Sequence, residues 1–173
     1  MSVEIHPTAI VKEGAELAEN VYIGPYCIID ENVKIGKNTK LTSHVVIQGH
    51  TTIGENNEFN QFSSIGVPPQ DKGYNGEPTE TIIGDSNLFR EGVTIHRATT
   101  KQDLKTIVGS HGYYMANVHI AHDCQLGNDV ILANAVNLAG HVIIENNAIV
   151  GGLTPIHQFV HIGCYAFVGG LSR

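Results

Sequence analysis

A large apolar residue recurs at every sixth position through most of this chain. The register runs without a break from Ile5 to Ile65, resumes from Ile83 to Ile95, and runs again from Val108 to Val168. A period of six matches neither the 3.6 residues of a helical turn nor the two of a strand, so it indicates a repeat unit. Asparagine, which tolerates a left-handed turn, often follows three positions later: Asn20, Asn32, Asn38, Asn56 and Asn147.

Short strands joined by tight turns, three strands to a coil, would place each repeated apolar residue inside a prism. The predicted fold is therefore all-β, a parallel β-helix of hexapeptide repeats. Residues 18 apart should stack at the spacing of neighbouring strands, about 4.8 Å, and the runs are long enough for about eight coils. Parallel crossovers are normally right-handed, but hexapeptide repeats of this pattern resemble the left-handed exception.

Residues 1–173 are expected to form one domain with two loops. The register fails at about 66–82, which is rich in proline and glycine, and at about 96–107, which is polar and basic. Interruptions of a solenoid become loops on one face, and that face is commonly functional. The chain stops directly after the hexad at Val168 without a cap, so we expect a C-terminal portion that this chain lacks.

Composition excludes several classes of protein. The formal net charge of −7 argues against a nucleic-acid binder, which would need many phosphate contacts. There is no 18-residue apolar run and no signal-peptide pattern at the start, so we expect no transmembrane segment and a cytoplasmic location. The three cysteines match no metal or redox spacing, and Cys27 and Cys124 fall at small inner positions of the hexad, where a packed, reduced thiol is expected.

The ten histidines are concentrated beyond the first loop. Four of them occupy neither inner position of the hexad and are expected to point out of the prism, toward solvent or a neighbouring subunit: His119, His122, His141 and His157. Stacking at 18 residues places Asp123 beside His141, and it places His122 beside Gly140, with Gln158 one coil further. A base, a carboxylate that orients it and an unobstructed glycine N–H are what acyl transfer requires.

Several short sequence motifs resemble those of one known family. With NVHIAHDC at residues 117–124, LAGH at 138–141, HQF at 157–159, QDKGY in the first loop and TIHRAT at the second, the chain resembles the UDP-N-acetylglucosamine O-acyltransferases of lipid A biosynthesis. The resemblance covers the whole chain in order. It implies a homotrimer with sites between subunits, in which a 3-hydroxyacyl group passes from acyl carrier protein to the 3-hydroxyl of UDP-N-acetylglucosamine. No cofactor is implied beyond the phosphopantetheine arm of the carrier.

The resemblance also implies roles for single residues. His122 resembles the general base, Asp123 the carboxylate that holds it, and Gly140 the oxyanion donor through its N–H. The remaining matched positions resemble groups that contact the nucleotide sugar or the acyl chain: Gln70, Asp71, His96, His119, His141, His157, Gln158 and Gly170. A small residue at Gly170 leaves the acyl groove open in the family, which predicts a long donor of the 14-carbon kind.

Two departures from the family pattern stand out. The family has a lysine two residues after the loop aspartate, where this chain has Gly73, with its lysine at Lys72. The family also continues into a C-terminal helical domain that contributes nucleotide and carrier contacts, and this chain has none of it.

Three other readings remain open. A related acyltransferase acting on an amino sugar would use the same base and oxyanion donor, although the later N-acyltransferase of the pathway carries an extra N-terminal domain. A metal lyase on this fold pairs histidines five residues apart, a spacing absent here, so no metal is predicted. A truncated β-helix scaffold without full activity is the third.

Overall fold

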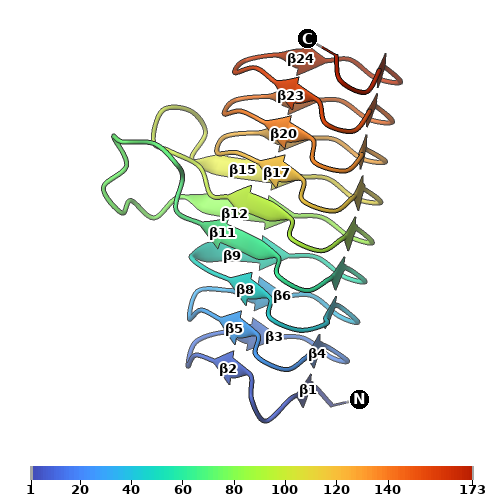
Figure 1. Cartoon of the computed structure of the whole chain (residues 1–173). Coiled ribbons are helices and arrows are strands. Elements are labelled where there is room, and N and C mark those ends of the chain that lie inside the picture. Colours follow the sequence, from blue (N-terminus) through green and yellow to red (C-terminus); the bar gives the residue numbers. More distant parts are fainter. Residues whose placement is uncertain (1, 173) are drawn as a thin grey trace.

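The structure, a computed structural model, describes residues 2–172 and consists there of strands joined by turns and loops. Three parallel sheets form the faces of a prism that rises from the N-terminus to the C-terminus (Figure 1). Residues 2–172 contain no helix of the length and apolar character that crossing a bilayer requires. The fold is a left-handed parallel β-helix, as predicted.

Each sheet takes every third strand. The first sheet contains nine strands: β1 (Glu4–Ile5), β4 (Tyr22–Ile23), β7 (Lys40–Leu41), β10 (Glu58–Phe59), β13 (Leu88–Phe89), β16 (Tyr113–Tyr114), β19 (Ile131–Leu132), β22 (Ile149–Val150) and β25 (Phe167–Val168). The second contains β2 (Ile10–Val11), β5 (Ile28–Ile29), β8 (Val46–Ile47), β11 (Ser64–Val67), β14 (Thr94–His96), β17 (His119–Ile120), β20 (Asn137–Leu138) and β23 (Pro155–Ile156). The third contains β3 (Glu16–Leu17), β6 (Lys34–Ile35), β9 (His50–Ile53), β12 (Glu80–Ile83), β15 (Lys105–Val108), β18 (Gln125–Leu126), β21 (Ile143–Ile144) and β24 (His161–Ile162).

The hexad register builds the core. The repeated apolar residue is the second of each two-residue strand and points inward, as in Ile23, Leu41 and Leu132, which are fully buried. Away from the loops, paired residues are 18 apart, for example Ile120 with Leu138. The cysteine prediction is confirmed at two positions and does not extend to the third: Cys27 and Cys124 are free and buried, whereas Cys164 is exposed.

Aromatic residues continue the core column across the looped coils. Phe59 stacks on Phe89 with ring centroids 4.5 Å apart, and Phe89 stacks on Tyr114 at 4.8 Å. These separations are close to the spacing of strands in a sheet, about 4.8 Å. Coils that carry a long insertion therefore keep the same rise as coils without one, and the residues after the loops stay in register.

The corners turn through left-handed backbone. Asn20, Asn38, Asn56 and Asn147 have φ between 57° and 61°, as predicted, but Asn32 does not adopt a positive φ. Adjacent corner amides also bond to one another: Asn20 Nδ2 donates to Asn38 Oδ1, and Asn38 Nδ2 donates to Asn56 Oδ1, both at 3.0 Å. Asparagine thus both accepts the turn and links successive coils.

The two loops are shorter than predicted and leave the prism on the same side (Figure 1). The first spans residues 68–79, because β11 extends to Val67 and β12 begins at Glu80. The second spans residues 97–104, since β14 ends at His96 and β15 begins at Lys105. The predicted bounds, 66–82 and 96–107, included strand residues because β11, β12, β14 and β15 are each longer than two residues and extend into these ranges. His96 therefore lies in a strand.

Candidate active site

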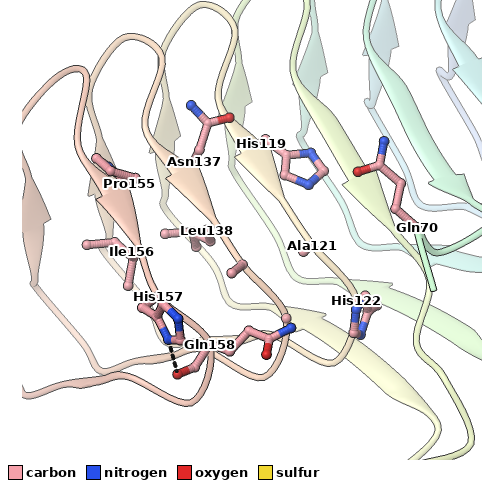
Figure 2. Close-up of a pocket in the computed structure, with 12 residues that line it drawn as sticks. Gln70, His119, Ala121, His122, Asn137, Leu138, Pro155, Ile156, His157 and Gln158 are labelled. Atoms are coloured by element: carbon pink, nitrogen blue, oxygen red, sulfur yellow. Dashed lines mark hydrogen bonds between the residues drawn. The ribbon is translucent and has the colours of Figure 1, made fainter. Parts of the chain in front are cut away.

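A groove of about 510 Å³ runs across successive coils beside the loops. Figure 2 shows Gln70, His119 and His122 at one end and Pro155, Ile156 and His157 at the other. The lining mixes polar groups with an apolar floor: Gln70, His119, Ala121, His122, Asn137, Leu138, Ala139, Gly140, Pro155, Ile156, His157 and Gln158. Six of these are predicted site residues, and Asn137, Pro155 and the apolar floor were not predicted.

The predicted base and its carboxylate form a hydrogen-bonded pair. His122 Nδ1 and Asp123 Oδ2 lie 2.7 Å apart. Neighbouring residues of a strand point to opposite faces, so such a pair requires a corner. Asp123 supplies it with a φ of 61°, and aspartate is among the residues that tolerate this conformation. The bond to the carboxylate places the proton on Nδ1, which leaves Nε2 as the acceptor.

His122 lines the groove and lies outside the apolar core, as expected for a side chain that points out of the prism, but the expectation of solvent exposure is wrong. His122 is 7% exposed and Asp123 is 1% exposed within a single chain, because the second loop covers them. Thr99 in that loop donates its hydroxyl to Asp123 Oδ2 at 2.7 Å. Burial favours a neutral carboxyl, but the hydrogen bonds from His122 and Thr99 outweigh it, and the pKa of Asp123 lies below its usual value.

Gly140 lies directly against the imidazole of His122. A Cβ at Gly140 would stand 2.4 Å from His122 Cε1 and 2.8 Å from Nε2, so any larger residue would displace the imidazole. Within residues 2–172 the Gly140 N–H donates no hydrogen bond. A free N–H one coil from the base, on the wall of the groove, is suited to an oxyanion that forms beside His122.

Two further histidines pack together at the end of the groove nearest the first loop. His119 lines the groove, and its Nδ1 lies 2.7 Å from Thr94 Oγ1. His96 packs edge-on against it, with centroids 4.8 Å apart, and is only 6% exposed. Burial, together with the charges of His119 and His122, lowers the pKa of His96 to about 4. His96 does not line the groove, so its predicted substrate contact is not supported by this arrangement.

The second loop also contacts His141, which does not line the groove. His141 Nδ1 is 2.8 Å from Gln102 Oε1, and its ring stacks on Phe159 at 4.6 Å. Its ring meets that of His122 edge-on at 5.2 Å. Burial keeps the pKa of His141 below the usual value despite the neighbouring Asp123 carboxylate. His141 therefore packs against the base without lining the groove.

The first loop contributes two predicted residues with different surroundings. Gln70 is exposed and lines the groove (Figure 2). Asp71 does not line it, because its carboxylate is bonded to the Lys101 ammonium and to the Gly73 N–H. The Lys101 bond, followed by the Gly73 bond, lowers the pKa of Asp71. The loops are thus tied together through a lysine of the second loop.

The remaining predicted residues lie toward the last coils. His157 and Gln158 are exposed on the groove wall, with His157 Nδ1 3.3 Å from the Gln158 carbonyl. Gly170 does not line the groove. It is exposed in the final turn, where a Cβ would stand 3.2 Å from the Gly152 carbonyl oxygen. The proposed effect of Gly170 on acyl length stays a prediction.

Three of these groups could also approach one metal ion. Ligand atoms of His122, Asp123 and His141 all lie within 4.8 Å of one another, although no metal was predicted. Two imidazoles and one carboxylate are suitable ligands for zinc. However, His122 Nδ1 and the Asp123 carboxylate are already bonded to each other, and Gln102 engages His141 Nδ1. The present hydrogen bonds fit a base and its supports better than a metal centre.

Fold and repeat together define a protein of hexapeptide repeats: the family described as "Bacterial transferase hexapeptide (six repeats)" matches residues 14–49. The chain is 60% identical over 166 residues to the acyl-[acyl-carrier-protein]–UDP-N-acetylglucosamine O-acyltransferase of Leptothrix cholodnii. That match covers 96% of this chain and 63% of the relative. The chain belongs to the UDP-N-acetylglucosamine O-acyltransferase family.

Solved structures agree with this assignment. LpxA from Acinetobacter baumannii superposes with a TM-score of 0.96 at 51% identity, covering 97% of this chain and 65% of that one. LpxA from Bacteroides fragilis, a UDP-N-acetylglucosamine acyltransferase, gives a TM-score of 0.78 at 37% identity, covering 92% and 67%. The chain thus spans about two thirds of the length of these relatives.

Proposed function

We propose that this chain carries the acyl-transfer site of an enzyme that moves a 3-hydroxyacyl group from acyl carrier protein to the 3-hydroxyl of UDP-N-acetylglucosamine. This transfer is the first step of lipid A biosynthesis. The observation that carries the proposal is the buried His122–Asp123 pair, whose ring lies against Gly140 on the wall of a groove. The name of the Leptothrix relative supplies the donor and the acceptor.

The geometry supports a general-base mechanism. Nε2 of His122 accepts the proton of the sugar hydroxyl while that oxygen attacks the thioester carbonyl carbon. The negative charge on the carbonyl oxygen is stabilised by the Gly140 N–H. Asp123 stabilises the imidazolium that forms. As the C–S bond breaks, the phosphopantetheine sulfur takes the proton from His122, which restores the neutral base.

Partners and location follow from the same proposal. The groove is open along one wall of a single chain, which is consistent with a homotrimer whose sites lie between subunits. Acyl carrier protein is the donor, and the reaction takes place in the cytoplasm. The apolar floor of the groove, with Leu138 and Ile156, suits an acyl chain, while His119 and Asn137 suit a polar acceptor.

Substitution of the base tests the proposal. His122→Ala should lower turnover by about 10²–10⁴-fold, the range for a lost general base. His50→Ala is the matched control, because His50 is exposed on β9 and does not line the groove. Turnover near that of the parent in His122→Ala would refute the mechanism. Comparison of 3-hydroxyl and 3-amino acceptors in the same assay decides between an oxygen and a nitrogen nucleophile.

A further inference from the structure

The second loop, residues 97–104, bonds to three groups of the site at once. Thr99 bonds to Asp123, Gln102 meets His141, and Lys101 pairs with Asp71 of the first loop. The polar and basic composition of residues 96–107 indicated a functional loop, but the one predicted site residue in that range, His96, lies in β14. None of residues 97–104 was predicted. A polar side chain in a non-repeating loop has no register from which its target could be read.

Thr99 makes the closest contact of this loop with the catalytic pair. Its hydroxyl donates to Asp123 Oδ2 at 2.7 Å, and its N–H lies 3.2 Å from both carboxylate oxygens. The Lys101 N–H donates to Thr99 Oγ1 at 3.2 Å, so the hydroxyl proton is free to point at the carboxylate. Thr99 is 3% exposed and Asp123 is 1% exposed. Water therefore cannot replace a bond that is lost.

The bonds from Thr99 fix both the charge and the direction of the Asp123 carboxylate. A buried carboxylate must receive hydrogen bonds if it is to remain ionised. Asp123 Oδ2 is shared by Thr99 Oγ1 and His122 Nδ1, at 2.7 Å each. Rotation of the carboxylate away from His122 would break the bonds from Thr99 as well. The imidazole is thus held through the carboxylate by a residue to which it makes no hydrogen bond.

We propose that Thr99 is a positioning residue of the acyl-transfer site: its hydrogen bonds hold the Asp123 carboxylate in the orientation that aims His122 at the groove. The inference rests on the proposed function for its kinetic consequences. The geometry of the His122–Asp123 pair exists without substrate, so this part of the inference does not depend on the proposed function. The second loop is on this account part of the active site and not only its cover.

Three variants separate positioning from simple anchoring of the loop. Thr99→Val keeps the branched shape and removes the hydroxyl, whereas Thr99→Ser keeps the hydroxyl. Thr100→Val is the control, since Thr100 is the exposed neighbour in the same loop. Each variant is compared in turnover, in the KM for UDP-N-acetylglucosamine and in thermal unfolding. Nitrogen-15 chemical shifts of the His122 ring report its bond to Asp123 without any substrate.

Positioning predicts a specific pattern. Thr99→Val should lower kcat by about 10- to 100-fold, as loss of one hydrogen bond to a charged group implies, with little change in KM. The His122 Nδ1 shift should move, and Thr99→Ser should restore both. An unmoved Nδ1 shift in Thr99→Val would overturn the proposal, as would equal losses in the Val and Ser variants. If the parent chain transfers no acyl group, the shifts still decide the positioning, and the substrate assignment alone fails.

Discussion

Replacement of Gly140 by alanine offers a direct test of how closely the base is packed. The new Cβ would stand 2.4 Å from His122 Cε1, about 1 Å short of the 3.4 Å at which ordinary contact begins. The ring cannot rotate away freely, because Nδ1 is bonded to Asp123 at 2.7 Å and Thr99 holds that carboxylate in turn. The ring and its carboxylate must therefore shift together, or their bond must lengthen.

The magnitude follows from the size of that shift. Misplacement of a catalytic group by about 1 Å can cost about 10²-fold in rate, so kcat of Gly140→Ala should fall by about that factor. Gly140 does not adopt a left-handed φ, so alanine is allowed by the backbone and the N–H is retained. The free energy of unfolding should fall by no more than about 1–3 kcal/mol, the ordinary cost of a crowded contact.

Steady-state kinetics and thermal unfolding of Gly140→Ala, beside Gly163→Ala, make the measurement. Gly163 is a matched control because a Cβ there would meet nothing within 4 Å. Its kcat should equal that of the parent. A Gly140→Ala chain with near-parental kcat would refute the reasoning, since it would show that the imidazole can move by about 1 Å without loss of its function.

Two further predictions concern protonation and metal. Burial lowers the pKa of His96 from 6.5 to about 4. Between these two pH values the unfolded chain binds a proton at this residue and the folded chain does not. The stability that neutral His96 contributes is therefore present above about pH 6.5 and is lost as the pH falls toward 4. The unfolding temperature should fall through that window, and less steeply in His96→Gln; equal slopes in the two chains would contradict the assignment. A chelator should leave acyl transfer unchanged, because His122 Nδ1 already bonds to Asp123. If activity were lost on chelation and restored by zinc, the result would indicate a metal centre of His122, Asp123 and His141 instead.

The repeat could be read from the sequence because every hexad obeys the same geometry. Once Ile120 and Leu138 are assigned to the interior, the pairing of β17 with β20 follows, and with it the approach of Gly140 to His122. The loops obey no such period. Thr99, Lys101 and Gln102 could not be assigned to their targets, since nothing in their spacing shows how residues 97–104 fold back. For the same reason the burial of His122 and Asp123 was not predicted from the sequence.

The coils therefore stabilise the fold and the loops orient the groups of the site, and mutations can separate these two roles. Coil residues such as Leu132 and Ile120 are fully buried and do not line the groove, so their loss should weaken the fold before it changes the chemistry. Loop residues such as Lys101 and Gln102 are exposed yet bond to the site, so their loss should change the chemistry and leave the fold intact. Thr99 lies at the junction. Thr99 is buried like a core residue, but its polar atoms are directed at the carboxylate that orients the base. Comparison of Thr99→Val with Thr99→Ser therefore best separates an effect on stability from an effect on catalysis.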